Sequence, residues 1–288
     1  MTRNRNGLLL LLAGSAVDSS SGLLTRLTTA DGFTTASARG FLAFGFLFAV
    51  LALVTRGRPF AALRAIGPWG LGFAVMNSAG MVLNVLSLKF TSPANFFMIF
   101  ATAPFIAALL AWGFLKERPD RPTLIAALAG LLGIAIMVSG GLKGVNLGDV
   151  LALVVVLGYC ANVLILRRAP QIEVLPLITA TVLGSGLLAL PFASFGALSA
   201  PDWAVLTTLG FLQLGLGNIL IFSAVSRVTA AEAGLLGLMG AVFAPLWVLA
   251  GLGELPPTPT LIGGAVILVA GVTHFFATLG RTPPKSQE

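Results

Sequence analysis

The chain has 288 residues, of which 57% are hydrophobic and only 9% charged, and its formal net charge is +7. A soluble domain carries roughly 25% charged residues, so this chain cannot cover a folded surface with charge and is expected to lie in a lipid bilayer. Its basic residues fall in short segments between apolar stretches, which favours membrane orientation over a nucleic-acid partner. The single cysteine, Cys160, excludes an internal disulfide and a cysteine-built metal site. No metal and no cofactor are expected.

Ten apolar stretches are long enough for membrane-spanning helices, because a helix needs about 20 apolar residues to cross the hydrocarbon. Lipid-exposed backbone must satisfy its own hydrogen bonds, and these stretches lack the alternation of polar and apolar residues that is typical of a β-barrel. The expected fold is therefore an all-α integral membrane protein. In chain order the expected spans are 7–27, 33–54, 66–88, 93–115, 123–139, 150–166, 174–195, 203–225, 230–252 and 260–279.

The distribution of Lys and Arg predicts the orientation of these spans. With a cytoplasmic N-terminus, thirteen basic residues fall in inside segments, and the outside segments hold four, namely Arg26, Arg39, Lys89 and Lys143. Both termini are therefore expected in the cytoplasm. The basic start and apolar run of the first span could also indicate a cleaved signal peptide. The corresponding helix of the second half lies in mid-chain, which argues against cleavage.

A short motif occurs twice at a constant offset. Residues 117–125 read ERPDRPTLI and residues 254–262 read ELPPTPTLI, with six of nine positions identical at an offset of 137. This indicates two copies of one unit. Five spans separate the copies, and because five is odd the two units must lie in opposite orientations. We expect residues 1–143 and 144–288 to form two inverted five-helix repeats in one membrane domain, with a substrate site near the bilayer midplane and alternating access.

Asp18 is the only acidic residue near the middle of an expected span, where a charge costs at least about 2.5–3.5 kcal/mol. Small and polar residues surround it at helical spacing, namely Gly14, Ser15, Ser21, Gly22 and Thr25. Such a face could line a hydrated cavity in which Asp18 holds a substrate ammonium or exchanges a proton. Alternatively, the small residues permit close helix packing and Asp18 bonds to a neighbouring helix.

Further polar side chains fall in corresponding spans of the two halves. With Asp18, the candidates for a substrate cavity are Ser15, Ser19, Asn77, Asn84, Asn95, Tyr159, Asn162, Gln213 and Asn218. Each could contact the polar head of a substrate, or could form an interhelical hydrogen bond worth less than about 2 kcal/mol. Asn95 lies at a helix start, where anions are attracted, although simply starting the helix is the plainer role.

Two apolar helices end alike, APFIAALLAWGFLKE at 103–117 and APLWVLAGLGE at 244–254, and each is followed by the Pro-Thr-Leu-Ile start of the next helix. In these motifs the chain resembles the drug/metabolite transporter superfamily, specifically its ten-helix EamA-type permeases, and among them the bacterial amino-acid exporters of the YddG type. The resemblance implies a secondary transporter of the bacterial cytoplasmic (inner) membrane with a central cavity between two five-helix halves. Lys116 and Asp18 depart from the family pattern and leave the coupling mechanism open.

We therefore expect a secondary transporter that exports amino acids, aromatic or other apolar ones among them, or similar small metabolites by alternating access. Its expected partners are the small-molecule substrate and the lipid bilayer, with proton coupling an open option. Alternatives are an exporter of other metabolites or drugs, or a permease for facilitated diffusion. An intramembrane enzyme would need a base, metal ligands or paired acids, and the chain has one histidine and a single mid-span acid, so no enzyme is expected.

Overall fold

The structure is a computed structural model that describes residues 5–115, 121–139, 146–168, 172–225, 227 and 230–278. Within these ranges the chain is α-helical and contains no β-strand, which confirms the all-α prediction. Six described helices are long and apolar enough to cross a membrane, and four further stretches are shorter apolar helices. These ten helical stretches correspond in order to the ten expected spans.

The helices of the first half run from the N-terminal segment to residue 139. They are α1 (Arg5–Ser19) with α2 (Ser21–Leu27), α3 (Gly32–Val54), the short α4 (Pro59–Ala65), α5 (Gly67–Phe90), α6 (Pro93–Phe100) with α7 (Ala103–Leu115), and α8 (Arg121–Ser139). The helices of the second half are α9 (Leu147–Arg168), α10 (Val174–Ala189), α11 (Ala200–Thr207) with the π-helical η3 (Thr208–Leu216) and α12 (Gly217–Val225), α13 (Ala230–Leu252) and α14 (Thr258–Thr278). Two short 3₁₀ turns, η1 (Leu190–Phe192) and η2 (Phe195–Ala197), follow α10.

Two spans expected to be continuous are broken. The first ends one helix at Ser19 and starts another at Ser21, and the Ser20 hydroxyl donates to the carbonyl of Val17 at 2.6 Å. The fourth is broken between α6 and α7, where Pro104 has no backbone N–H to continue the hydrogen-bond ladder. The Thr102 hydroxyl donates to the carbonyl of Ile99 at 2.7 Å at this break. Side-chain hydroxyls that bond to nearby carbonyls compete with helix geometry in this way.

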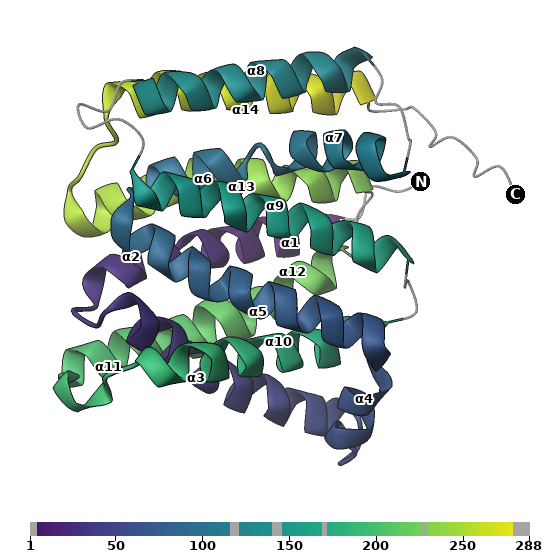
Figure 1. Cartoon of the computed structure of the whole chain (residues 1–288), viewed down its shortest axis with the longest axis vertical. Coiled ribbons are helices and arrows are strands. Elements are labelled where there is room, and N and C mark those ends of the chain that lie inside the picture. The colour runs from purple at the N-terminus through teal and green to yellow at the C-terminus, as the bar shows by residue number, and fades with distance from the viewer. Residues whose placement is uncertain are drawn as a thin grey trace, which may run out of the picture.

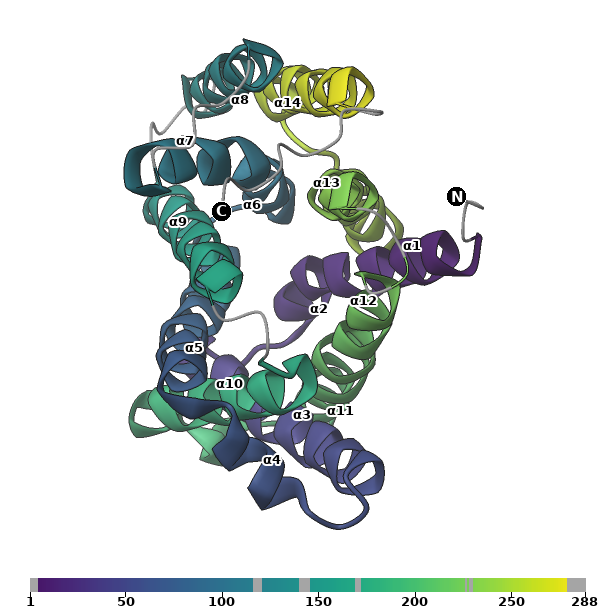
Figure 2. The same ribbon diagram turned by 90° about the vertical axis from the view of Figure 1, so that its right-hand side faces the viewer.

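Eight of the ten spans close a ring, and the remaining two form a pair outside it (Figure 2). Following helix contacts around the ring, α1 packs on α13, α13 on α6, α6 on α9, α9 on α5, α5 on α10, α10 on α3, and α3 on η3, which continues into α12 and returns to α1. The outer pair is α8 with α14, which packs against α6, α7 and α13. The ring is therefore built from both halves of the chain.

Contacts between helices of the two halves occur as equivalent pairs, in which each helix is replaced by its counterpart in the other half. The contact of α5 with α9 corresponds to that of α12 with α1, and the contact of α7 with α9 corresponds to that of α13 with α1. The pairs α3 with α10 and α8 with α14 each join equivalent helices. Figure 1 shows α1 and α9 running in opposite directions across the bundle. These contacts are those expected of two inverted units, while the boundary at residues 143 and 144 falls outside the described residues and stays a prediction.

The ends of α7 and α13 lie on opposite sides of the bundle, although each precedes a copy of the repeated motif (Figure 1). Glu117 itself falls outside the described residues, whereas Glu254 follows α13 directly. The start of α1 and the end of α14 lie on one side (Figure 1). We call this the terminal side of the bundle, and the side that holds Glu254 the opposite side.

Glycines allow the two pairs of equivalent helices to approach closely. A Cβ atom on Gly40 of α3 would lie 2.7 Å from the backbone nitrogen of Gly186 in α10. At this crossing the Ser37 hydroxyl donates to the carbonyl of Gly186 at 3.0 Å. In the outer pair, a Cβ on Gly133 or on Gly263 would meet the carbonyl oxygen of the other glycine. Small residues at such crossings are a principal source of helix association in lipid, where apolar side chains gain nothing by avoiding water.

Candidate functional site

A polar pair links the two halves next to the break in the first span. Asp18 lies near the end of α1, and the side-chain nitrogen Nε2 of Gln213 donates to its Oδ1 at 2.9 Å. Gln213 is buried in the π-helical segment η3. π-Helical turns inside helices are frequent at functional sites. The expectation that Asp18 bonds to a neighbouring helix therefore holds, and its partner is another member of the candidate set.

Arg39 is a buried cation that the sequence analysis placed wrongly. It was expected among the outside segments, but it lies within α3 with only 3% of its surface exposed. Its Nη2 donates to the carbonyl of Met81 in α5 at 2.9 Å. When hydropathy is averaged over a window of residues, the flanking apolar residues outweigh a single arginine. Moving Arg39 out of the outside segments leaves three basic residues there and strengthens the predicted orientation.

Tyr159 and Asn162 belong to α9, which lies on the other side of the ring. Figure 2 shows α9 and the α1–α2 span on opposite sides of the ring. Tyr159 is 45% exposed, and its ring lies 5.1 Å from that of Phe100, measured between centroids. That Asp18 and Tyr159 line one substrate cavity stays a prediction.

Asn162 lies one helical turn beyond Tyr159, and its side chain forms a hydrogen bond to α5. Its Nδ2 donates to Oδ1 of Asn77 in α5 at 3.3 Å. Asn84 lies seven residues after Asn77, so both fall on one face of α5, and Asn84 is half-buried. The structure thus brings Asn77, Asn162 and Tyr159 together on one side of the ring, and Asp18 with Gln213 on the other.

Two buried oxygens of these side chains accept no hydrogen bond from the described residues. They are Oε1 of Gln213 and Oδ1 of Asn162. The buried hydroxyl of Thr25 in α2 likewise has no hydrogen-bond partner among the described residues. Buried polar atoms are nearly always hydrogen-bonded, and leaving one unpaired costs about 1–3 kcal/mol. Because Nε2 of Gln213 is committed to the carboxylate of Asp18, its Oε1 is fixed as an acceptor.

The other candidates have local roles in this structure. Ser15 and Ser19 are buried and donate to carbonyls of their own helix, at Leu11 and Ala16. Asn218 donates to the carbonyl of Leu214 at 2.6 Å within its own span. The small residues around Asp18 serve mainly as a packing face, since a Cβ on Gly14 would lie 2.8 Å from Ile221 of α12. Their assignment to a substrate cavity stays a prediction.

Asn95 belongs to a separate polar network. Its Oδ1 accepts from the Thr260 hydroxyl of α14 at 2.6 Å, and its Nδ2 lies 3.5 Å from Oδ1 of Asp149 in α9. The Thr91 hydroxyl donates to the same Asp149 oxygen at 2.5 Å. This network joins the start of α6 to the starts of α9 and α14. No contact with Asp18 is found for Asn95 among the described residues.

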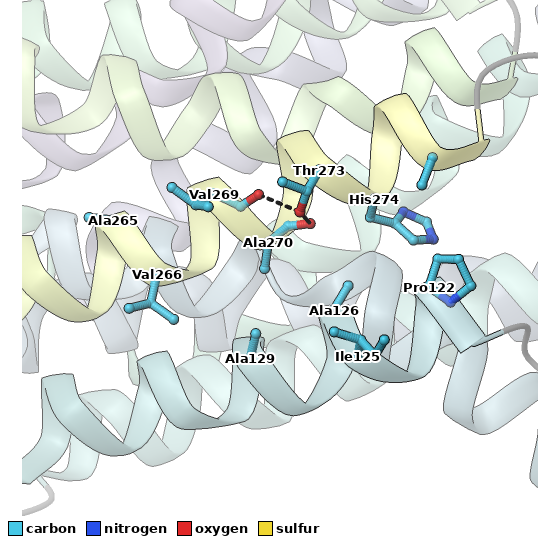
Figure 3. A pocket seen from close by; sticks show the side chains of 11 residues that line it. Pro122, Ile125, Ala126, Ala129, Ala265, Val266, Val269, Ala270, Thr273 and His274 are labelled. Carbon is cyan, nitrogen blue, oxygen red and sulfur yellow. Dashed lines mark hydrogen bonds between the residues drawn. The ribbon is translucent and has the colours of Figure 1, made fainter.

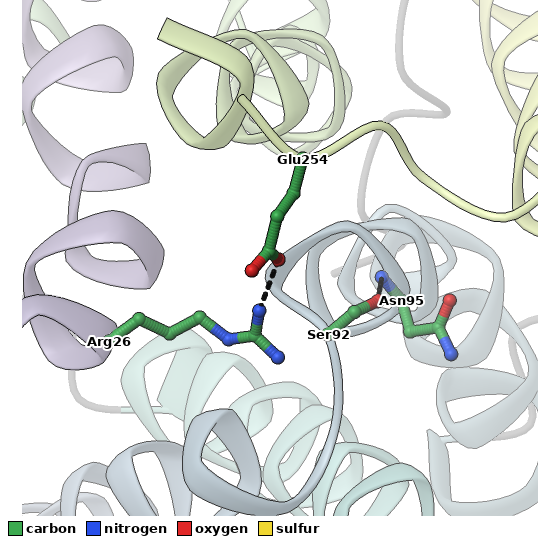
Figure 4. A network of polar contacts seen from close by, with 4 residues as sticks. All are labelled: Arg26, Ser92, Asn95 and Glu254. Atoms are coloured by element: carbon green, nitrogen blue, oxygen red, sulfur yellow. Dashed lines mark hydrogen bonds and ion pairs between the residues drawn. The ribbon is translucent and has the colours of Figure 1, made fainter. Parts of the chain in front are cut away.

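An ion pair joins the two halves on the opposite side of the bundle. Nη1 of Arg26, at the end of α2, lies 2.5 Å from Oε2 of Glu254 (Figure 4). Gly253 precedes Glu254 with a φ of +68°, a left-handed conformation that ends α13 and turns the chain toward α2. Asp202 also joins the two halves on this side. Its carboxylate accepts hydrogen bonds from the Thr28 hydroxyl at 2.9 Å and from the Thr29 amide at 2.7 Å. The sequence contains the charges of this ion pair but no signal that pairs them.

The fold is that of a multi-pass helical membrane protein in which helices of the two halves pack together. The family model of the EamA-like transporter family matches the chain twice, over residues 5–139 and 146–276. The chain therefore belongs to the EamA-like transporter family of the drug/metabolite transporter superfamily, whose members transport small molecules.

A solved structure has a similar fold. A crystal structure of another protein matches with a TM-score of 0.68 and 18% identity over 96% of this chain and 98% of its own. At this identity the likeness concerns the fold alone. Comparison with curated proteins gave no match. A closer relation to exporters of the YddG type stays a prediction.

Proposed function

We propose that the protein is a secondary transporter that exports amino acids, aromatic or other apolar ones among them, or closely similar small metabolites by alternating access. Membership of the EamA-like family supports the transporter class. The observation that carries the substrate class is the hydrogen-bonded pair of Asp18 and Gln213, which is contributed by both halves of the chain.

The chemistry of the site favours a substrate with an amine. A carboxylate at Asp18 attracts a cation, and the unpaired Oε1 of Gln213 and Oδ1 of Asn162 accept hydrogen bonds from N–H groups. The aromatic rings of Tyr159 and Phe100 offer contact to the apolar part of the same molecule. The guanidinium of Arg39 balances the charge of Asp18, so a substrate with no net charge enters a neutral site.

Inverted repeats supply the mechanism that we propose. Two conformations that exchange the roles of the two halves open the site alternately to each side of the membrane. The Arg26–Glu254 ion pair joins the two halves on the opposite side, and we propose that it breaks and forms again in this cycle. Asp18 is the acid of the site, and we assign to it the exchange of a proton that couples export to a proton gradient.

We further propose that the protein lies in a bacterial-type inner membrane with both termini in the cytoplasm. The terminal side then faces the cytoplasm, and Glu254 faces outward. Labelling of a single cysteine at position 254, in a Cys160→Ala background, by a membrane-impermeant maleimide should occur from outside intact cells. Labelling only after the cells are broken would reverse the orientation.

Transport in proteoliposomes tests the function. Radiolabelled phenylalanine and leucine are compared with N-acetylphenylalanine, which has no ammonium, and with phenethylamine, which has no carboxylate. We expect the amino acids to move in protein-containing vesicles but not in protein-free ones, and N-acetylphenylalanine not to move. Transport of none of a broad panel of metabolites would overturn the proposal.

A pH gradient separates the two modes of transport. With the membrane potential held at zero, we expect an imposed gradient to accumulate substrate against its own concentration gradient. Equilibration to equal concentrations, unchanged by the pH gradient, would overturn coupling and favour a permease for facilitated diffusion.

A further inference from the structure

An apolar groove lies between α8 and α14, away from the polar interior. It has a volume of about 610 Å³, and alanines on both helices form much of its wall, including Ala126, Ala129, Ala265 and Ala270 (Figure 3). Ligand sites in proteins occupy about 300–1,000 Å³. Because α8 and α14 form the pair outside the ring, this groove opens to the bilayer.

The groove follows from how the two helices cross. They touch backbone to backbone at Gly133 and Gly263, so their axes must diverge on either side of that point. On the terminal side of the crossing the facing side chains are mostly alanines, which are too short to fill the widening space. Larger apolar side chains, Ile125 and Val269, stand at its edge with 67% and 63% of their surface exposed.

Polar groups within the groove are bonded to the protein. The Thr273 hydroxyl donates to the carbonyl of Val269 at 2.7 Å, as Figure 3 shows. Nε2 of His274 lies 2.9 Å from the Thr123 hydroxyl, and its ring packs against that of Phe105. The wall therefore offers an apolar surface along its length.

A positive charge stands at one end of this surface. Arg121 is exposed and is the first residue of α8, directly before Pro122, which lines the groove. The N-terminus of a helix carries a partial positive charge of its own. The combination of a long apolar wall with a cation at the membrane surface is complementary to an amphiphile with an anionic head.

We propose that this groove binds an anionic phospholipid, with one acyl chain between α8 and α14 and the phosphate at Arg121. Basic pockets between transmembrane helices bind the head groups of anionic lipids on the cytoplasmic side of membranes. With the orientation proposed above, Arg121 lies at the cytoplasmic leaflet. The lipid site is separate from the transport site, and its test does not require transport.

Two variants separate the contributions of head group and chain. Arg121→Gln removes the cation, and its control, Arg58→Gln, removes another exposed arginine, directly before α4. Ala129→Phe fills the groove from α8, and its control, Leu128→Phe, places the same ring on an exposed neighbour that does not line it. Ala265→Phe fills the groove from α14 and serves if Ala129→Phe does not fold.

Native mass spectrometry of the detergent-purified protein counts the lipids that stay bound after addition of phosphatidylglycerol or phosphatidylcholine with identical chains. We expect the unmodified protein to retain phosphatidylglycerol preferentially, and Arg121→Gln to reduce that preference by about five-fold. The phenylalanine variants should lose retention of both lipids, and both controls should behave as the unmodified protein.

Equal retention of the two lipids by the unmodified protein, or retention unchanged in the groove-filling variants, would overturn the proposal. The same spectra report mass. A dimer that the groove-filling variants convert to a monomer would assign the groove to a second copy of the chain and would equally overturn the lipid site.

Discussion

Arg26 and Glu254, separated by 228 residues, form an ion pair of 2.5 Å that joins the two halves of the chain on one side of the bundle. Their side chains are 34% and 55% exposed. An exposed ion pair contributes only about 0–1 kcal/mol to stability. The pair is therefore too weak to hold the fold together, but its small energy would suit a contact that breaks and forms in the transport cycle proposed above.

Locking this contact should stop transport without unfolding the protein. In a Cys160→Ala background, Arg26→Cys and Glu254→Cys are joined by a short bis-methanethiosulfonate reagent. We expect the cross-linked protein to lose export, because α2 and the end of α13 can no longer separate, and a reducing agent to restore it. Each single-cysteine variant treated with the reagent is the control. Full activity of the cross-linked protein would show that this contact stays closed throughout the cycle.

Removing the charge of Asp18 should weaken the binding of amine-bearing substrates. A hydrogen bond to a charged group is worth about 1.5–3 kcal/mol, so Asp18→Asn should raise the KM for such substrates by roughly 10- to 100-fold. Ser15→Ala on the same helix is the control, because the Ser15 hydroxyl bonds only to its own helix in the contacts described. An unchanged KM, with unchanged dependence on pH, would assign Asp18 a packing role.

A side chain on Gly40 should separate α3 from α10. The Cβ of Gly40→Ala would lie 2.7 Å from the backbone nitrogen of Gly186, and backbone cannot move aside as a flexible side chain can. We expect a loss of about 1–3 kcal/mol, as for overpacked cores, seen as a lower midpoint in thermal unfolding. Gly45→Ala lies on the same helix with nothing within 4 Å of the added atom. Its unfolding midpoint should equal or exceed that of the unmodified protein.

Asp31 caps the start of α3 outside the membrane-spanning segments. Its Oδ1 accepts from the amides of Phe33 and Thr34 at 2.8 and 3.0 Å, and its Oδ2 accepts from the Thr34 hydroxyl. Burial acts to raise the pKa of this carboxyl, but the hydrogen bonds outweigh burial and lower the pKa below its ordinary value of 3.8. The cap therefore contributes fully above pH 3.8 and is lost as the pH falls through the lowered folded-state pKa.

Replacement of this cap should show that dependence. Asp31→Ala should lower the free energy of unfolding by about 1 kcal/mol at pH 7, and the difference from the unmodified protein should shrink in acid. Asp31→Asn keeps a capping oxygen without a titrating group, so it should retain most of the stability at pH 7. Thermal unfolding in detergent between pH 3 and pH 7 measures both. A constant difference across that range would mean that the carboxylate charge plays no part in the cap.

The sequence by itself determined the class, the number of spans and the two-fold repetition. These properties are written in contiguous residues: runs of apolar side chains set the spans, and the repeated motif at an offset of 137 set the repeat. Asp18 could also be identified, because a carboxylate within an apolar run is conspicuous against its neighbours. Local hydrophobicity needs no knowledge of what packs against it.

Only the tertiary structure decided which polar groups meet. Gln213 lies 195 residues from Asp18, and no pattern in either segment indicates that the two residues meet. Arg39 is buried because α3 packs beside α5, which a count of charges per segment cannot show. Charge, span and repeat are local properties of the chain, whereas a site shared by two inverted halves exists only after the helices have packed.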